Sequence, residues 1–169
     1  MSHPSTGETW KPLLPSYDWS TYGQLCCGIQ PTGTPTWRPS ERLATAWKTQ
    51  SAQQPYASCC ESGLWLLLGE LDQSHELSQS VSQPEGSYWH GIMHRLEGDF
   101  WNSKYWFRKV GKHPVLEQLR KEFPGYPDAF VDLSEQAFSL SSINNQVAAI
   151  GQREWQLLFD FCWDRATRG

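Results

Sequence analysis

The chain has 169 residues, of which 38% are hydrophobic and ten are tryptophan, and its formal net charge is −4. This length fits one domain with a core of ordinary size, and such an aromatic composition argues against a disordered chain. The acidic balance argues against nucleic acid as a general partner, because neutralising phosphates requires a strongly basic surface.

Neither a secretion signal nor a membrane segment is evident in the sequence. The first residues, MSHPSTGETWKP, contain neither the basic start nor the apolar stretch of a secretion signal. The longest apolar run, residues 64–68, is far too short to span a bilayer. We therefore expect a cytoplasmic protein with no membrane contact. Its five cysteines include two adjacent pairs without CxxC spacing, which predicts free, buried thiols.

Residues 1–38 are predicted to form an irregular N-terminal arm, because Pro, Gly, Ser and Thr are frequent there. Aromatic residues nevertheless recur along this segment, which is not typical of disorder. We expect the arm to be ordered and to lie over the core through Trp10, Tyr17, Trp19, Tyr22 and Trp37.

Residues 39–169 show helical periodicity and no convincing alternating strand, so they are predicted to form the helical core. Ser40, Ser87, Asp128 and either Ser141 or Ser142 are candidate N-caps, and Pro114 suits a first helical turn. We expect helices over residues 41–53, 56–80, 87 onward, 114–123, 128–138 and about 142–166. The predicted fold is all-α: a compact helical bundle in which residues 1–169 form one domain.

The strongest candidate site follows the turn at residues 84–86. His90, His94 and Glu97 are spaced i, i+4 and i+7, so they share one helical face. Gly98 can interrupt this helix; if the helix continues through Gly98, the same face includes Trp101, Tyr105 and Arg108. Two imidazoles and a carboxylate suit Zn(II) or Fe(II) and leave positions open for water or substrate. The alternative is that both histidines are half-buried and hydrogen-bonded as part of the core.

His75 is a third candidate, because it continues the apolar stripe of the helix predicted over residues 56–80. An unsatisfied polar group in a core costs about 1 to 3 kcal/mol, so the imidazole must be paired, for example with Asp72. The sequence HELSQ resembles the metalloprotease motif HExxH, but Gln79 replaces the second histidine. A hydrogen-bonded core histidine and a metal ligand both remain open.

Glu154 lies in the middle of the apolar face of the last predicted helix. Burying a carboxylate is costly unless it is paired or bound to a cation. It is therefore predicted to be buried, either in an ion pair with Arg95 or Arg108 or as a metal ligand or general base.

The segment WNSKYWFRKVGKH interleaves aromatic and basic residues, a pattern that can stack a planar ring and hold an anion. More often such a segment is a helix with packed aromatics and solvated basic side chains. Two stretches, GSYWHGIMHRLEGDFWNSKYWFRKVGKHPV and QREWQLLFDFCW, resemble a family of small microbial proteins. The resemblance covers roughly residues 56–166 and implies no activity, cofactor or catalytic residue.

These patterns together predict a pocket that binds or acts on a small anionic metabolite. His90, His94 and Glu154 are the candidate catalytic residues, and with His75 they form the candidate ligand set for a divalent ion, Zn(II) or Fe(II). Arg95, Trp101, Tyr105 and Arg108 are the candidate ligand-binding residues. Metal-assisted hydrolysis or isomerisation would fit this set. The alternative is a non-catalytic binding module whose aromatic and basic face contacts a protein or an RNA segment.

Overall fold

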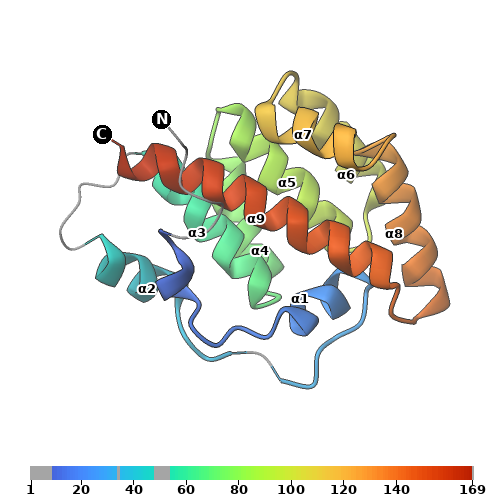
Figure 1. Cartoon of the computed structure of the whole chain (residues 1–169), viewed down its shortest axis with the longest axis horizontal. Helices are drawn as coiled ribbons and strands as arrows, with labels where there is room; N and C mark the ends of the chain where they lie inside the picture. The colour runs from blue at the N-terminus through green and yellow to red at the C-terminus, as the bar shows by residue number, and fades with distance from the viewer. Residues whose placement is uncertain (1–8, 34, 48–53, 169) are drawn as a thin grey trace.

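The computed structural model describes residues 9–33, 35–47 and 54–168. These residues form helices and no strand, which confirms the all-α prediction (Figure 1). The elements in chain order are η1 (Lys11–Leu13), α1 (Trp19–Cys26), α2 (Pro39–Ala46), α3 (Tyr56–Leu67), α4 (Leu71–Gln79), α5 (Pro84–Leu96), α6 (Phe100–Val110), α7 (Pro114–Glu122), α8 (Asp128–Leu140) and α9 (Asn145–Thr167).

Helix α9 runs along the length of the molecule and packs against α1, α3, α7 and α8 (Figure 1). Asn144 caps its first turn, where the side chain accepts hydrogen bonds from the amides of Gln146 and Val147. Trp155, in its middle, is completely buried and donates from Nε1 to the carbonyl of Gly63 at 2.7 Å. This bond ties α9 to α3 in the centre of the core.

Two glycines end helices within segments that have a continuous helical pattern in the sequence. Gly69 and Gly98 have φ values of +72° and +85°, a left-handed conformation that favours glycine and ends an α-helix. The continuous helix expected over residues 56–80 is therefore wrong. Of the two alternatives that the sequence left open at Gly98, the structure shows the interrupted helix. Instead α3 folds back on α4 and α5 folds back on α6.

Buried serine hydroxyls mark where each of these hairpins is packed. Ser62 on α3 donates to the carbonyl of Ser74 on α4 at 3.0 Å. Ser103 on α6 donates to the carbonyl of Gly91 on α5 at 2.7 Å. Because α4 also packs against α5, the three helices α4, α5 and α6 lie side by side.

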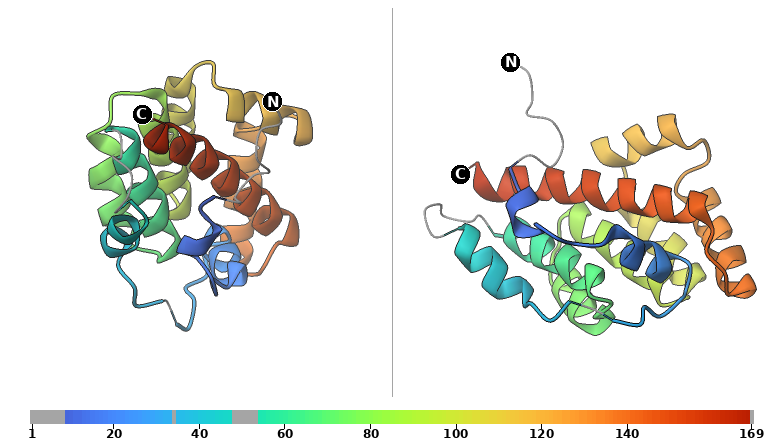
Figure 2. Two further views of the ribbon diagram at one scale, coloured as in Figure 1. Left: turned by 60° about the vertical axis from the view of Figure 1, so that its left-hand side comes forward. Right: turned by 60° about the horizontal axis from the view of Figure 1, so that its bottom comes forward.

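The N-terminal arm is more regular than predicted, because it contains α1. Asp18 caps this helix by accepting a hydrogen bond from the amide of Ser20 at 3.0 Å. This cap was not predicted from the sequence, because Pro and Gly are abundant around it. As expected, the described part of the arm lies over the core (Figure 2), and it packs there through aromatic residues. Trp10 and Trp19 both contact Trp155 edge to face, with ring centroids 5.5 and 5.3 Å apart.

Several helix boundaries also differ from the predicted ones. Helix α2 begins at Pro39, and part of the helix expected over residues 41–53 lies outside the described residues. Helix α5 begins at Pro84 rather than Ser87, because proline fits the first helical turn without losing a hydrogen bond. Helix α7 begins at Pro114 as predicted, and all five cysteines are free and buried. Among the described helices, none combines the length and apolarity needed to cross a bilayer.

Candidate functional site

Three histidines meet where α4 packs against α5. His75 comes from α4, and His90 and His94 lie one turn apart on α5. One ring nitrogen from each histidine can be chosen so that all three lie within 4.8 Å of one another. The ring centroids of His75 and His90 are 4.5 Å apart, and those of His90 and His94 are 4.7 Å apart. The structure therefore brings together the three histidines of the predicted metal set.

His90 is held in one orientation by Ser78. The hydroxyl of Ser78 donates to the backbone carbonyl of His75 at 3.2 Å and lies 3.3 Å from Nδ1 of His90. With its own hydrogen engaged, the hydroxyl accepts one from Nδ1, which leaves the lone pair of His90 on Nε2. Burial, together with His94 and His75, lowers the pKa of His90 to about 4. His90 is therefore neutral at pH 7, the state in which imidazole binds metal ions.

His94 is held in the same way by a carboxylate. Its Nδ1 lies 2.6 Å from Oε1 of Glu97 and 4.0 Å from Oδ2 of Asp99. An ionised carboxylate only accepts hydrogen bonds, so Nδ1 of His94 is the donor and its Nε2 faces away from Glu97. Histidines that bind metal commonly donate their other ring hydrogen to a carboxylate in this way. The turn at Gly98 places Glu97 and Asp99 beside His94.

The third helix of this layer contributes Trp106 rather than the aromatic residues that the sequence predicted. Because α6 folds back along α5, the ring of Trp106 lies 4.1 Å from that of His90, measured between centroids. Trp101 is 72% exposed and its ring is parallel to that of Tyr105, 6.1 Å away. Arg108 is exposed. The predicted alignment of positions 90 to 108 on one helix is therefore wrong.

Glu154 is buried, as predicted, and its partner is Arg95. The two form a two-pronged ion pair with distances of 2.9 and 2.5 Å, and both side chains are 0% exposed. The hydroxyl of Tyr126 donates to the same carboxylate at 2.7 Å. The Glu154 carboxylate is not in the histidine group, so the structure does not bring this predicted ligand to the others. Arg95 is likewise committed to Glu154 rather than to a pocket.

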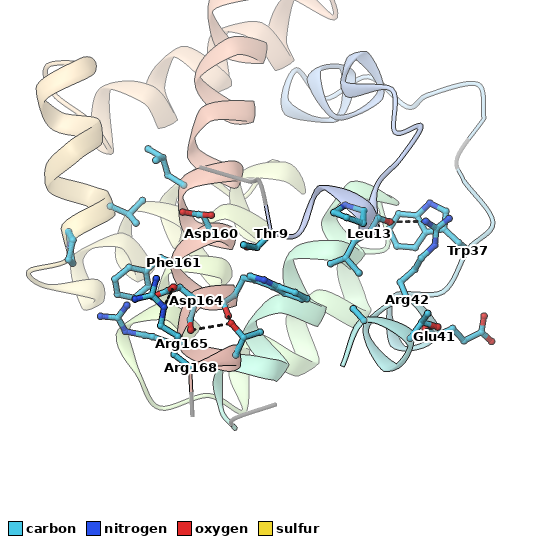
Figure 3. Close-up of a pocket in the computed structure, with 18 of the residues that line it drawn as sticks. Thr9, Leu13, Trp37, Glu41, Arg42, Asp160, Phe161, Asp164, Arg165 and Arg168 are labelled. Atoms are coloured by element: carbon cyan, nitrogen blue, oxygen red, sulfur yellow. Dashed lines mark hydrogen bonds and ion pairs between the residues drawn. The ribbon is translucent and has the colours of Figure 1, made fainter. Parts of the chain in front are cut away.

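A large groove lies elsewhere, between the N-terminal arm, α2, α7 and α9, and has a volume of about 1210 Å³ (Figure 3). Trp37 and Arg42 form one side, where the guanidinium lies 4.9 Å from the indole centroid. Phe161 and Arg165 form the opposite side, with the guanidinium 3.5 Å from the phenyl centroid. None of the predicted site residues lines this groove, so it is not the pocket that the sequence predicted.

Sequence patterns did not reveal Ser78, which orients His90, or Trp106, which flanks it. Ser78 follows His75 by three residues, which is a usable signal once both are placed on one helix. Trp106 could be found only by recognising the turn at Gly98, which reverses the chain direction. Glu97 was placed on the correct face, although it ends α5 rather than continuing it.

The chain was also compared with known proteins. No family model, no curated protein and no solved structure matches it. The resemblance to a family of small microbial proteins therefore stays a prediction, and only the geometry of the site bears on function.

Proposed function

We propose that this protein binds a divalent metal ion, Zn(II) or Fe(II), through His75, His90 and His94. We further propose that it uses the remaining coordination position to act on a small anionic metabolite. The reaction class that we favour is metal-assisted hydrolysis or isomerisation.

The observation that carries this proposal is the convergence of three imidazoles, two of which have their Nδ1 hydrogen engaged by the protein. Ser78 accepts from His90 and Glu97 accepts from His94, so the Nε2 lone pairs of both are available. A three-histidine set leaves one position of a tetrahedral ion for water or substrate. The two histidines on α5 are almost fully buried, at 2% and 9% exposure, while His75 is half-buried and lies at the solvent side.

When bound, such an ion polarises carbonyl or phosphoryl oxygens and lowers the pKa of a coordinated water to about 7. Glu97 and Ser78 orient the imidazoles of His94 and His90 through hydrogen bonds to Nδ1. The low pKa of His90 means that no proton has to be removed from it before an ion binds at neutral pH. The chain thus orients two of the three proposed metal ligands before an ion binds.

Elemental analysis of the full chain, purified without a histidine tag, tests this proposal most directly. We expect close to one equivalent of zinc or iron, and we expect metal-free protein to take up one equivalent of Zn(II) in a calorimetric titration. His75→Ala should abolish tight binding, because His75 supplies one of three ligands. The matched control is Asp72→Asn, one turn earlier on α4: in the structure this exposed residue forms no hydrogen bond with His75, so the variant should bind as the parent chain does. Metal-free protein that binds no Zn(II), or a His75→Ala variant that binds it normally, would contradict the proposal.

The second candidate function, a binding module, is favoured by the exposed Trp101 and Tyr105 pair on α6. Both large rings face solvent, and Lys109 lies over Tyr105 at 4.9 Å. An aromatic and basic surface of this kind suits a protein or RNA segment that carries acidic groups. Metal-free protein together with partner binding that is lost in Trp101→Ala would favour this function over the first.

A further inference from the structure

Lys109 is a cation placed beside the histidine cluster. Its ammonium lies 4.8 Å from the ring centroid of Trp106 and 4.9 Å from that of Tyr105. Lys109 is exposed and forms no ion pair with any carboxylate in the described part of the chain, whereas Lys104 on the same helix pairs with Asp132 at 2.5 Å. Its charge is therefore available to an anion from solution.

Trp106 connects this cation to the histidines. Its ring lies 4.1 Å from that of His90, and the Lys109 ammonium lies over the same indole. The Trp106 indole therefore contacts both the Lys109 ammonium and the imidazole of His90. Between the two lies the half-buried indole of Trp106, with the ring of Tyr105 set edge to face against it at 5.6 Å.

The charges around the cluster are arranged asymmetrically. Glu97 and Asp99 lie on the side of His94, and Lys109 lies on the side of Trp106. An acid group of a ligand is repelled from the first side and attracted to the second. Arg95, the cation that the sequence suggested for this role, is fully buried in its pair with Glu154.

We infer that the site accepts a planar organic acid that carries a second oxygen donor opposite its carboxylate. This inference rests on the proposed metal centre. The carboxylate is held by the ammonium of Lys109, the planar body lies along the exposed part of the Trp106 indole, and the second oxygen reaches the open coordination position. A rigid planar body suits this arrangement, because it covers apolar surface with little loss of conformational entropy.

The test uses the full-length chain loaded with Co(II), a visible-absorbing substitute for Zn(II), and three probes. 4-Hydroxybenzoate has both groups, phenol lacks the carboxylate, and benzoate lacks the second oxygen. We expect 4-hydroxybenzoate to change the Co(II) spectrum at concentrations about tenfold lower than either of the others, as one added charge-assisted contact requires.

Lys109→Gln should remove the preference for 4-hydroxybenzoate over phenol and leave Co(II) affinity unchanged. Lys112→Gln, which changes an exposed lysine just beyond α6, is the matched control and should keep the preference. Equal binding of the three probes, or a preference that survives in Lys109→Gln, overturns this inference while leaving the metal centre intact. A chain that gives no Co(II) spectrum at all overturns the metal centre and this inference together.

Discussion

Replacing Glu154 by Gln removes the only carboxylate that is bonded to Arg95 in the described structure. The side chain keeps its shape, but the guanidinium is left as an uncompensated charge at 0% exposure. Arg95 also packs over the ring of Phe130 at 4.2 Å, and its Nε has no hydrogen-bond partner among the described residues. Breaking a buried pair in this way costs about 3 to 5 kcal/mol. That is a large part of the total stability of a typical domain, which is about 5 to 15 kcal/mol.

Urea denaturation followed by far-UV circular dichroism measures this loss. The matched control is Glu122→Gln, which breaks the more exposed ion pair with Arg153 and should cost less than about 1 kcal/mol. A double variant, Arg95→Met with Glu154→Leu, should regain most of the lost stability, because apolar side chains of similar size replace the pair without a stranded charge.

The stabilising role of the buried ion pair is refuted if Glu154→Gln costs no more than Glu122→Gln. The same role is refuted if Glu154→Gln keeps the stability of the parent chain but loses Zn(II) affinity. In that case Glu154 would act on the metal centre, although its carboxylate lies outside the histidine group.

Three further predictions concern the cluster and the turn beside it. The pKa of His90 falls from 6.5 in the unfolded chain to about 4 in the fold, so acid favours the unfolded state. Metal-free protein should therefore lose about 1 to 3 kcal/mol between pH 6.5 and 4, and urea curves at several pH values should show a smaller loss in His90→Gln. Glu97→Gln should weaken Zn(II) binding about 10- to 100-fold in calorimetry, because Glu97 orients His94. The control Glu76→Gln, on α4, should leave the affinity unchanged. Equal Zn(II) affinities in the two variants would mean that Glu97 does not orient His94. Gly98→Ala places an alanine at a residue with positive φ, and its Cβ would lie 3.3 Å from the ring of Phe138. Urea denaturation should show a free energy of unfolding lower by about 1 to 2 kcal/mol. The control Gly33→Ala adds a methyl group in open space and should not lower it.

Regular spacing in the sequence was enough to predict several features of the structure. The common face of His90 and His94 depends on helical periodicity, and the burial of Glu154 in an ion pair depends also on the cost of an unpaired charge. The start of α7 at Pro114 depends on the fit of proline to a first helical turn. The reversal at Gly69 was not predicted and the one at Gly98 was left open, because a single glycine inside a helical pattern is compatible with either a continuous helix or its end. The choice is made by packing between helices, which spacing does not reveal. The positions of Trp106 and Lys109 beside the cluster depend on the same reversal.

The whole histidine cluster comes from one continuous stretch of chain, between the start of α4 at Leu71 and the end of α6 at Val110. Its contacts join residues that are close in sequence, whereas the arm and α9 meet across a separation of about 150 residues, as in the bond from Trp10 to Asp160. Local contacts of this kind close early in folding, and distant ones close later. Local opening of a native chain also tends to follow such units. The cluster can therefore assemble before the chain ends are docked, and a bound ion would stabilise the helical hairpins rather than the seam between arm and α9.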